Sequence, residues 1–180
     1  FSEFDFSNHS ALKNWPTHDI SNLKAALLAS DLTIKHIEEN EVSDLNNFLS
    51  KSLESMTSFN KKAHRFEMIE DEDGVLHIND SKATNFSATV KSIESSSKLN
   101  KEGDIYLLCG GDFKSQSIDK VKATIFNDIK KCFIFGKDKK ILEELLSDFT
   151  NCICCENLDD AYFLAKQESI NGDIILLSPA

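Results

Sequence analysis

The sequence predicts an α/β protein with a Rossmann-like, doubly wound and mainly parallel sheet, preceded by a helical region. From Phe66 onward, short apolar runs alternate with helical stretches across short Gly/Asp junctions, which is typical of βαβ units. The run Ile105–Cys109 is continuously apolar, as in a parallel strand covered on both faces. All six glycines lie at position 74 or later. Right-handed crossovers should then bring the strand ends to one side of the sheet.

The region before Gly74 is rich in Ser and Asn and has helical spacing. The stretch Ser21–Ala29 is a good helix former, entered from Pro16–Asp19. A second helix is expected to start at Ser43-Asp44 and carries apolar residues at helical spacing. Phenylalanines at positions 1, 4 and 6 alternate with polar residues and could be strand remnants.

The second region is expected to contain six strands and four helices. The strands are expected at Phe66–Ile69, Val75–Ile78, Ile105–Cys109, Cys132–Phe135, Cys152–Cys154 and Ile174–Leu177. The helices are expected at Ser87–Ser96, Ile118–Asn127, Lys139–Leu146 and Leu158–Glu168.

Composition limits the possible partners. The chain has 180 residues, 41% hydrophobic and 28% charged, a globular balance with core enough for one or two domains. Its net charge of -10 argues against a nucleic-acid surface, which requires clustered Lys and Arg. No apolar run approaches the ~20 residues of a membrane helix, and the first residues do not resemble a signal peptide. We therefore expect a cytoplasmic protein.

The five cysteines indicate reduced thiols rather than a disulfide framework, because their number is odd. Cys152, Cys154 and Cys155 could suggest a metal cluster. Their segment also reads as a short buried strand, and no His lies close by in sequence to complete a zinc set. We therefore expect core cysteines and no metal site.

The most informative stretch is Asn79–Asn85, with the sequence Asn-Asp-Ser-Lys-Ala-Thr-Asn, between a predicted strand and a predicted helix. Ligands of open α/β sheets bind at the carboxyl ends of strands. The start of a helix also offers backbone N–H groups to an anion. The alternative is that Asp80 or Ser81 merely caps the next helix. Capping leaves Lys82 and Thr84 unexplained, so we favour an anion site.

Three other segments carry candidate site residues. The first, Gly110–Ser115, follows a predicted strand. Its paired glycines would let a ligand approach the backbone closely, and Lys114 supplies a cation. The alternative is an ordinary turn, which paired glycines alone more often form. Arg65, in the segment His64–Glu67 between the two regions, could bind phosphate, or a hinge salt bridge could form with Glu67. The third segment, Leu176–Ala180, ends the chain abruptly on an apolar strand with no tail, which suggests a truncated sequence.

Taken in order, His64–Glu67, Ile78–Asn85, Gly110–Ser115 and Leu176–Ala180 resemble the Mur ligases over nearly the whole chain. The string Asn79–Asn85 resembles the D-glutamate-adding members in particular. The resemblance implies that residues 1–62 are the end of the family's central ATP-binding domain. It implies that residues 63–180 are its Rossmann-like carboxy-terminal domain, truncated at its end. The UDP-binding domain, the ATP P-loop and the Mg²⁺ ligands would lie outside this chain, so we expect the fragment alone to be inactive.

The resemblance also implies roles for individual residues. Ser81, Lys82, Thr84 and Lys114 would bind D-glutamate. Asn22, Arg65 and Asp80 would bind ATP, with a weaker contribution from His18. Two departures from the family pattern flank His18: its Gly is here Thr17 and its first Asn is Asp19, whose carboxylate would repel a nucleotide phosphate. No residue of the fragment is assigned a catalytic role.

The activity implied is an ATP-dependent, amide-forming ligation in cytoplasmic peptidoglycan precursor synthesis. ATP, with Mg²⁺, would convert the carboxylate of UDP-N-acetylmuramoyl-L-alanine into an acyl phosphate, which the amine of D-glutamate attacks. We expect a monomer. Two alternatives remain open: a Mur-type ligase that adds another amino acid, and a non-catalytic Rossmann-like binding module that lacks the P-loop.

Overall fold

The computed structural model describes residues 12, 15–38, 45–56, 63–99, 102–112 and 124–179. The chain divides into two compact units, Phe1–Asn60 and Lys61–Ala180, and each is described by itself. The assignment of residues 1–62 and 63–180 to two domains of a ligase stays a prediction.

The described residues of the first unit form the helices α1 (Thr17–Glu38) and α2 (Leu45–Met56). The predicted helix at Ser21–Ala29 is confirmed and extends further at both ends. The second helix begins directly after Asp44, as predicted. A small apolar core holds the unit together and consists of Leu12, Leu23, Leu27 and Leu53. The strand expected near residues 1–6 lies outside the described residues.

The second unit is built on a six-stranded sheet with the order β1-β2-β6-β3-β4-β5. Its strands are β1 (Glu67–Glu70), β2 (Leu76–Asn79), β3 (Ile105–Gly110), β4 (Lys131–Phe135), β5 (Cys152–Cys154) and β6 (Ile174–Leu177). Only β1 among them is antiparallel to its neighbour; the other described pairs are parallel. The predicted mainly parallel, Rossmann-like sheet is confirmed, and the carboxyl ends of five strands share one edge.

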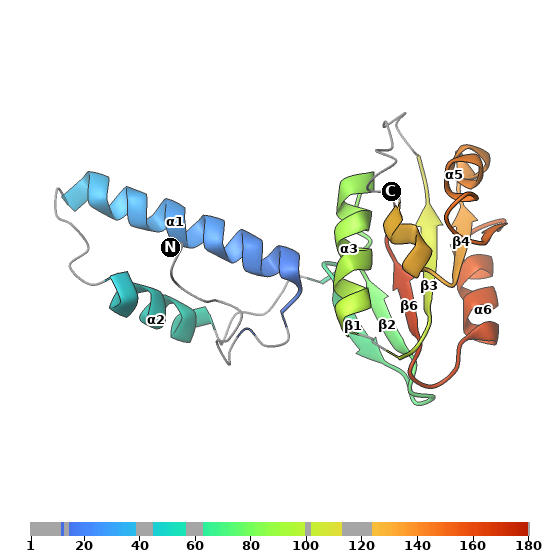
Figure 1. Cartoon of the computed structure of the whole chain (residues 1–180), viewed down its shortest axis with the longest axis horizontal. Coiled ribbons are helices and arrows are strands. Elements are labelled where there is room, and N and C mark those ends of the chain that lie inside the picture. The colour runs from blue at the N-terminus through green and yellow to red at the C-terminus, as the bar shows by residue number, and fades with distance from the viewer. Residues whose placement is uncertain are drawn as a thin grey trace. The chain divides into compact units, whose positions relative to one another are not determined.

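Helices cover both faces of this sheet, and α3 (Phe86–Leu99) and α6 (Leu158–Glu168) lie on opposite sides (Figure 1). Residues of α3 and α5 (Lys139–Leu146) pack with one set of strand residues, including Ile78, Leu107 and Ile134. The second core joins α6 to the alternate strand residues, including Leu108, Phe133 and Ile175. Every residue of β3 is therefore buried, as its continuous apolar sequence predicts.

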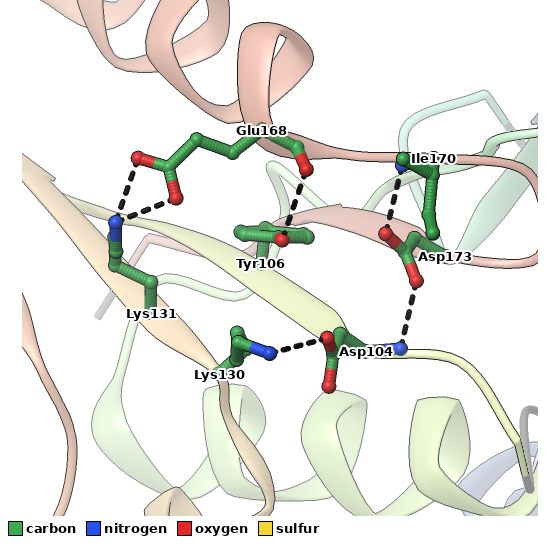
Figure 2. Close-up of polar contacts among 7 residues, drawn as sticks. All are labelled: Asp104, Tyr106, Lys130, Lys131, Glu168, Ile170 and Asp173. Atoms are coloured by element: carbon green, nitrogen blue, oxygen red, sulfur yellow. Dashed lines mark hydrogen bonds and ion pairs between the residues drawn. The ribbon is translucent and has the colours of Figure 1, made fainter.

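Charged side chains make polar contacts at the amino-terminal ends of the parallel strands, here called the amino edge of the sheet (Figure 2). The buried carboxylate of Asp173 accepts hydrogen bonds from the backbone N–H groups of Asp104, at 2.9 Å, and Ile170, at 2.8 Å. Lys131 reaches both oxygens of Glu168 at 2.6 and 2.5 Å, and Lys130 pairs with Asp104 at 2.7 Å. These contacts tie β3, β4 and the connection between α6 and β6 together.

Two local predictions need correction. The helix expected at Ile118–Asn127 is described only from residue 124, where Thr124–Asp128 forms a 3₁₀ helix that buries Phe126; such short tight turns are common connectors. Cys152 and Cys154 lie on a strand, as expected, but they are half-buried because β5 is the edge strand.

None of the described helices is both long and apolar enough to cross a membrane.

Candidate functional site

The candidate site lies at the carboxyl edge of the sheet, in the loop between β2 and α3. Asp80 begins this loop, and its N–H donates to the carbonyl of Leu177 on β6 at 2.8 Å. The helix α3 is capped by Asn85, whose side-chain oxygen accepts from the N–H of Ala88 at 2.9 Å. The alternative that Asp80 or Ser81 caps this helix is therefore wrong, and the loop before Asn85 needs another explanation.

Lys82 and Thr84 lie exposed on this loop. Within the described part of the chain, neither side chain has a hydrogen-bond or ion-pair partner. Ser81 is half-buried, and its N–H donates to the side-chain oxygen of Asn79 at 3.2 Å. The loop thus presents a cation and a hydroxyl to solvent from a backbone fixed by hydrogen bonds, an arrangement suited to a carboxylate or phosphate.

Asp80 is 9% exposed and is held by two donors. Its Oδ1 accepts from the N–H of Phe66 at 3.1 Å, and its Oδ2 accepts from the hydroxyl of Ser92, a buried residue of α3. A carboxylate has about four lone-pair sites, so these bonds leave acceptor capacity. The ATP contact assigned to Asp80 stays a prediction, and the structure adds a role in joining three segments.

Arg65 lies in the segment His64–Glu67 that leads into β1. Its side chain is exposed and has no hydrogen-bond or ion-pair partner among the described residues. Glu67 instead accepts from the N–H of His64 at 3.0 Å and lies 3.7 Å from its ring Nδ1, an ion pair only when that ring is protonated. The contact of Glu67 is thus made with His64 and not with Arg65, and the ATP contact assigned to Arg65 stays a prediction.

The two glycines after β3 have different surroundings. A Cβ on Gly110 would collide with the carbonyl oxygen of Phe135, so the close approach of β4 requires glycine here. A Cβ on Gly111 would meet nothing within 4 Å, although its φ of +122° still disfavours other residues. The close backbone approach expected at this pair is therefore made by β4 at Gly110, and Gly111 faces open space. Lys114 lies outside the described residues.

The candidate nucleotide residues of the first unit are only partly described. Asn22 lies on α1 with an exposed side chain. His18 belongs to the first turn of α1, but its side chain lies outside the description. Asp19, one of the departures from the family pattern, is half-buried in the same turn.

The structure identifies two residues near the site that sequence reasoning missed, Ser92 and Thr89, and describes the surroundings of a third, Ser178. Ser92 contacts Asp80, and Thr89 donates to the carbonyl of Pro179 at 2.9 Å, which ties α3 to the end of β6. Ser178 is fully buried, and its hydroxyl has no partner among the described residues. The sequence gives no signal for the first two contacts, because Ser92 and Thr89 are 12 and 90 positions from their partners and only the fold brings them together.

A cavity of about 260 Å³ lies on the α6 side of the sheet. The rings of His77 and Tyr162 line it, with centroids 5.7 Å apart, above an apolar floor that includes Leu108 and Ile175. Burial, together with the positive charge of Lys166, lowers the pKa of His77 below its usual value. The lowered pKa favours the neutral form of the His77 ring, in contrast to the cation that Lys82 places on the loop before α3.

The described residues contain no group of three or more His, Cys, Asp or Glu side chains that could hold a metal ion. The donor set of these described residues therefore does not fit a resident Mg²⁺ site.

Comparison with known proteins gives a consistent result. Residues 64–180 match the protein family described as "Mur ligase, glutamate ligase domain". Curated relatives named UDP-N-acetylmuramoylalanine–D-glutamate ligase include that of Francisella philomiragia, 32% identical over 81% of this chain and 36% of the relative. The relative from Haemophilus ducreyi is 39% identical over 66% of this chain and 26% of the relative. The chain thus spans about a quarter to a third of the length of these relatives.

Solved structures agree on the fold at low sequence identity. The UDP-N-acetylmuramate-alanine ligase MurC of Thermotoga maritima is 15% identical, with a TM-score of 0.60 over 90% of this chain and 34% of that protein. A bifunctional folylpolyglutamate synthase/dihydrofolate synthase of Yersinia pestis is 16% identical, with a TM-score of 0.58 over 81% of this chain and 34% of that protein.

Proposed function

This chain belongs to the Mur ligase family, and from that membership we propose that it is part of the ATP-dependent ligase that adds D-glutamate to UDP-N-acetylmuramoyl-L-alanine. The reaction would take place in the cytoplasm, during peptidoglycan precursor synthesis, and the protein would act as a monomer. One observation carries the proposal: Lys82 and Thr84 are both exposed on one loop at the carboxyl edge of the sheet. D-glutamate brings two carboxylates, which need such donors.

The residues of this chain would bind and orient two anionic substrates. Lys82, Thr84 and Ser81 would hold D-glutamate together with Lys114, and Arg65 would bind ATP phosphate. Asp80 would accept from ATP hydroxyls through its remaining lone pairs, and Asn22 and His18 would add contacts from the first unit. ATP supplies the phosphoryl group that activates the other substrate's carboxylate. Fixed cations and N–H donors lower the cost of bringing these negative charges together.

The test is a phosphate-release assay on the intact protein with ATP, Mg²⁺ and UDP-N-acetylmuramoyl-L-alanine. D-glutamate, L-alanine, L-lysine and meso-diaminopimelate would be supplied one at a time. We expect release with D-glutamate alone. Release with a different amino acid would identify another Mur-type specificity, and no release with any would support a non-catalytic binding module.

A further inference from the structure

Asp80 connects three segments that are far apart in the sequence. Its carboxylate accepts one hydrogen bond from the backbone of Phe66, before β1, and one from the hydroxyl of Ser92, inside α3. Phe66 and Ser92 are each only 1% exposed. We call this set of three residues the Asp80 network. Because it is shielded from water, its hydrogen bonds contribute more than equivalent bonds at the surface.

The backbone that the network holds is conformationally unfavourable. His64 and Phe66 have φ angles of +66° and +51°, in the left-handed region that residues with a side chain rarely adopt. Such conformations persist only where surrounding contacts enforce them. The surrounding contacts are present: the carbonyl of His64 accepts from the N–H of Lys82 at 3.3 Å, and its ring lies 2.9 Å from the side-chain amide of Asn79.

Arg65 lies between these two left-handed residues, and its exposed side chain is directed by their backbone. Lys82 belongs to the loop that supplies the restraining contacts. The segment with the proposed nucleotide cation and the loop with the proposed amino-acid cation are therefore joined through Asp80 and the His64 carbonyl.

We propose that Ser92 is a positioning residue of the ligase: it fixes the Asp80 carboxylate, which fixes the backbone at His64–Phe66 and so the direction of Arg65 relative to Lys82. The expected change in KM rests on the proposed function. The expected change in the backbone at His64–Phe66 does not. Without the Ser92 hydroxyl, Oδ2 of Asp80 would be buried without this donor, and the carboxylate would turn away from Phe66 to regain one. The left-handed segment would then relax.

The chain offers a matched control on the same helix. Ser96 is also fully buried, and its hydroxyl donates to the carbonyl of Ser92 at 2.9 Å without contacting Asp80. Ser92 itself lies 3.2 Å from the carbonyl of Ala88, so both serines can make the same bond within the helix. Ser92→Ala and Ser96→Ala therefore both remove one buried helical hydroxyl, but only the first removes the contact with Asp80.

The experiment measures two quantities on the intact protein: amide hydrogen exchange of the segment 64–67, and KM for ATP and D-glutamate alongside kcat. In Ser92→Ala we expect the amide exchange rate of this segment and the KM for ATP to rise about tenfold or more. This is the size of effect expected when one hydrogen bond to a carboxylate is lost. Exchange within α3 and KM for D-glutamate should change less. Ser96→Ala should leave the segment 64–67 and both KM values unchanged, and Ser92→Thr, which keeps a hydroxyl, should restore the wild-type values.

The inference is overturned if Ser92→Ala and Ser96→Ala give the same exchange in segment 64–67 and the same KM for ATP. Ser92→Cys, which keeps the size of the side chain but donates weakly, gives the same comparison if the alanine variant does not fold. If the wild-type protein uses no D-glutamate, the proposed function fails, and the exchange measurement alone still decides whether Ser92 and Asp80 hold this segment.

Discussion

Charged side chains are paired differently at the two ends of the parallel strands, the amino edge and the carboxyl edge of the sheet. At the amino edge, Lys131 pairs with Glu168, Lys130 pairs with Asp104, and Asp173 binds two backbone N–H groups (Figure 2). At the carboxyl edge, the exposed side chains of Arg65 and Lys82 have no partner within the described residues. The first edge therefore uses its charges to hold strands together. The second leaves the side chains of Arg65 and Lys82 exposed, as the proposed site for anionic substrates requires.

The largest expected effect tests whether Gly110, at the carboxyl edge, is required for the packing of β3 against β4. Gly110→Ala places a Cβ against the carbonyl of Phe135 in a backbone conformation that suits glycine, so we expect a loss of about 4 kcal/mol in unfolding free energy. Gly111→Ala is the matched control, because its Cβ would meet open space, and we expect about 2 kcal/mol or less. Urea unfolding of the intact protein measures both. Equal losses would contradict the assignment of Gly110 to strand packing.

The next effect belongs to the amino edge. Asp173→Ala removes a buried carboxylate that accepts from the partly buried N–H groups of Asp104 and Ile170, which should cost about 2 kcal/mol. Hydrogen exchange of β3 and β6 reports the loss for this unit. The exposed Asp148 provides the control, and its alanine variant should unfold like the wild type. If both variants behaved alike, the proposed role of Asp173 would be wrong.

A smaller effect is expected at the ion pair of Lys131 and Glu168. Lys131→Met removes a partly exposed pair, so the loss in unfolding free energy should be about 1 kcal/mol. Salt screens such pairs, and the difference from wild type should shrink as the ionic strength rises. Urea unfolding at low and high salt measures it. A difference that does not depend on salt would contradict the assignment of the loss to the ion pair with Glu168.

The smallest effect concerns pH and the cavity on the α6 side. Burial lowers the pKa of His77 in the folded protein, so the unfolded chain binds a proton more readily at this residue. Its contribution to stability is complete above the usual pKa of 6.5 and falls as the pH drops below that value. His77→Gln should flatten this part of the stability profile between neutral and mildly acidic pH. An unchanged profile in thermal unfolding would rule out His77 as its source.

The fold was predictable because its signals are local. The alternation of short apolar strands with helices locates β5, β6, α5 and α6 at their observed bounds. The 3₁₀ helix at Thr124–Asp128 was not predicted because its five residues are also compatible with the end of an α-helix. The exposure of β5 was missed because Cys152 and Cys154 do not reveal which strand lies at the edge of the sheet.

The candidate site was predictable only in part. Residue types and their order pointed to the loop at Asp80–Thr84 and to Arg65 as candidates. In the structure the side chain of Arg65 is exposed, and the carboxylate of Asp80 is hydrogen-bonded within the protein. Ser92 could not be found, because its contact with Asp80 depends on how α3 packs above β2. The sequence also could not separate Gly110 from Gly111, since only the position of β4 makes their surroundings different.

The most direct test of the central claim compares one lysine from each edge in the intact protein. Lys82→Ala should lower kcat/KM for D-glutamate by more than about tenfold and leave the unfolding free energy unchanged. Lys130→Ala removes the same side chain at the amino edge, and should leave the kinetics unchanged with a slightly lower stability. If Lys82→Ala used D-glutamate as well as the wild type does, the carboxyl edge would not be the amino-acid site.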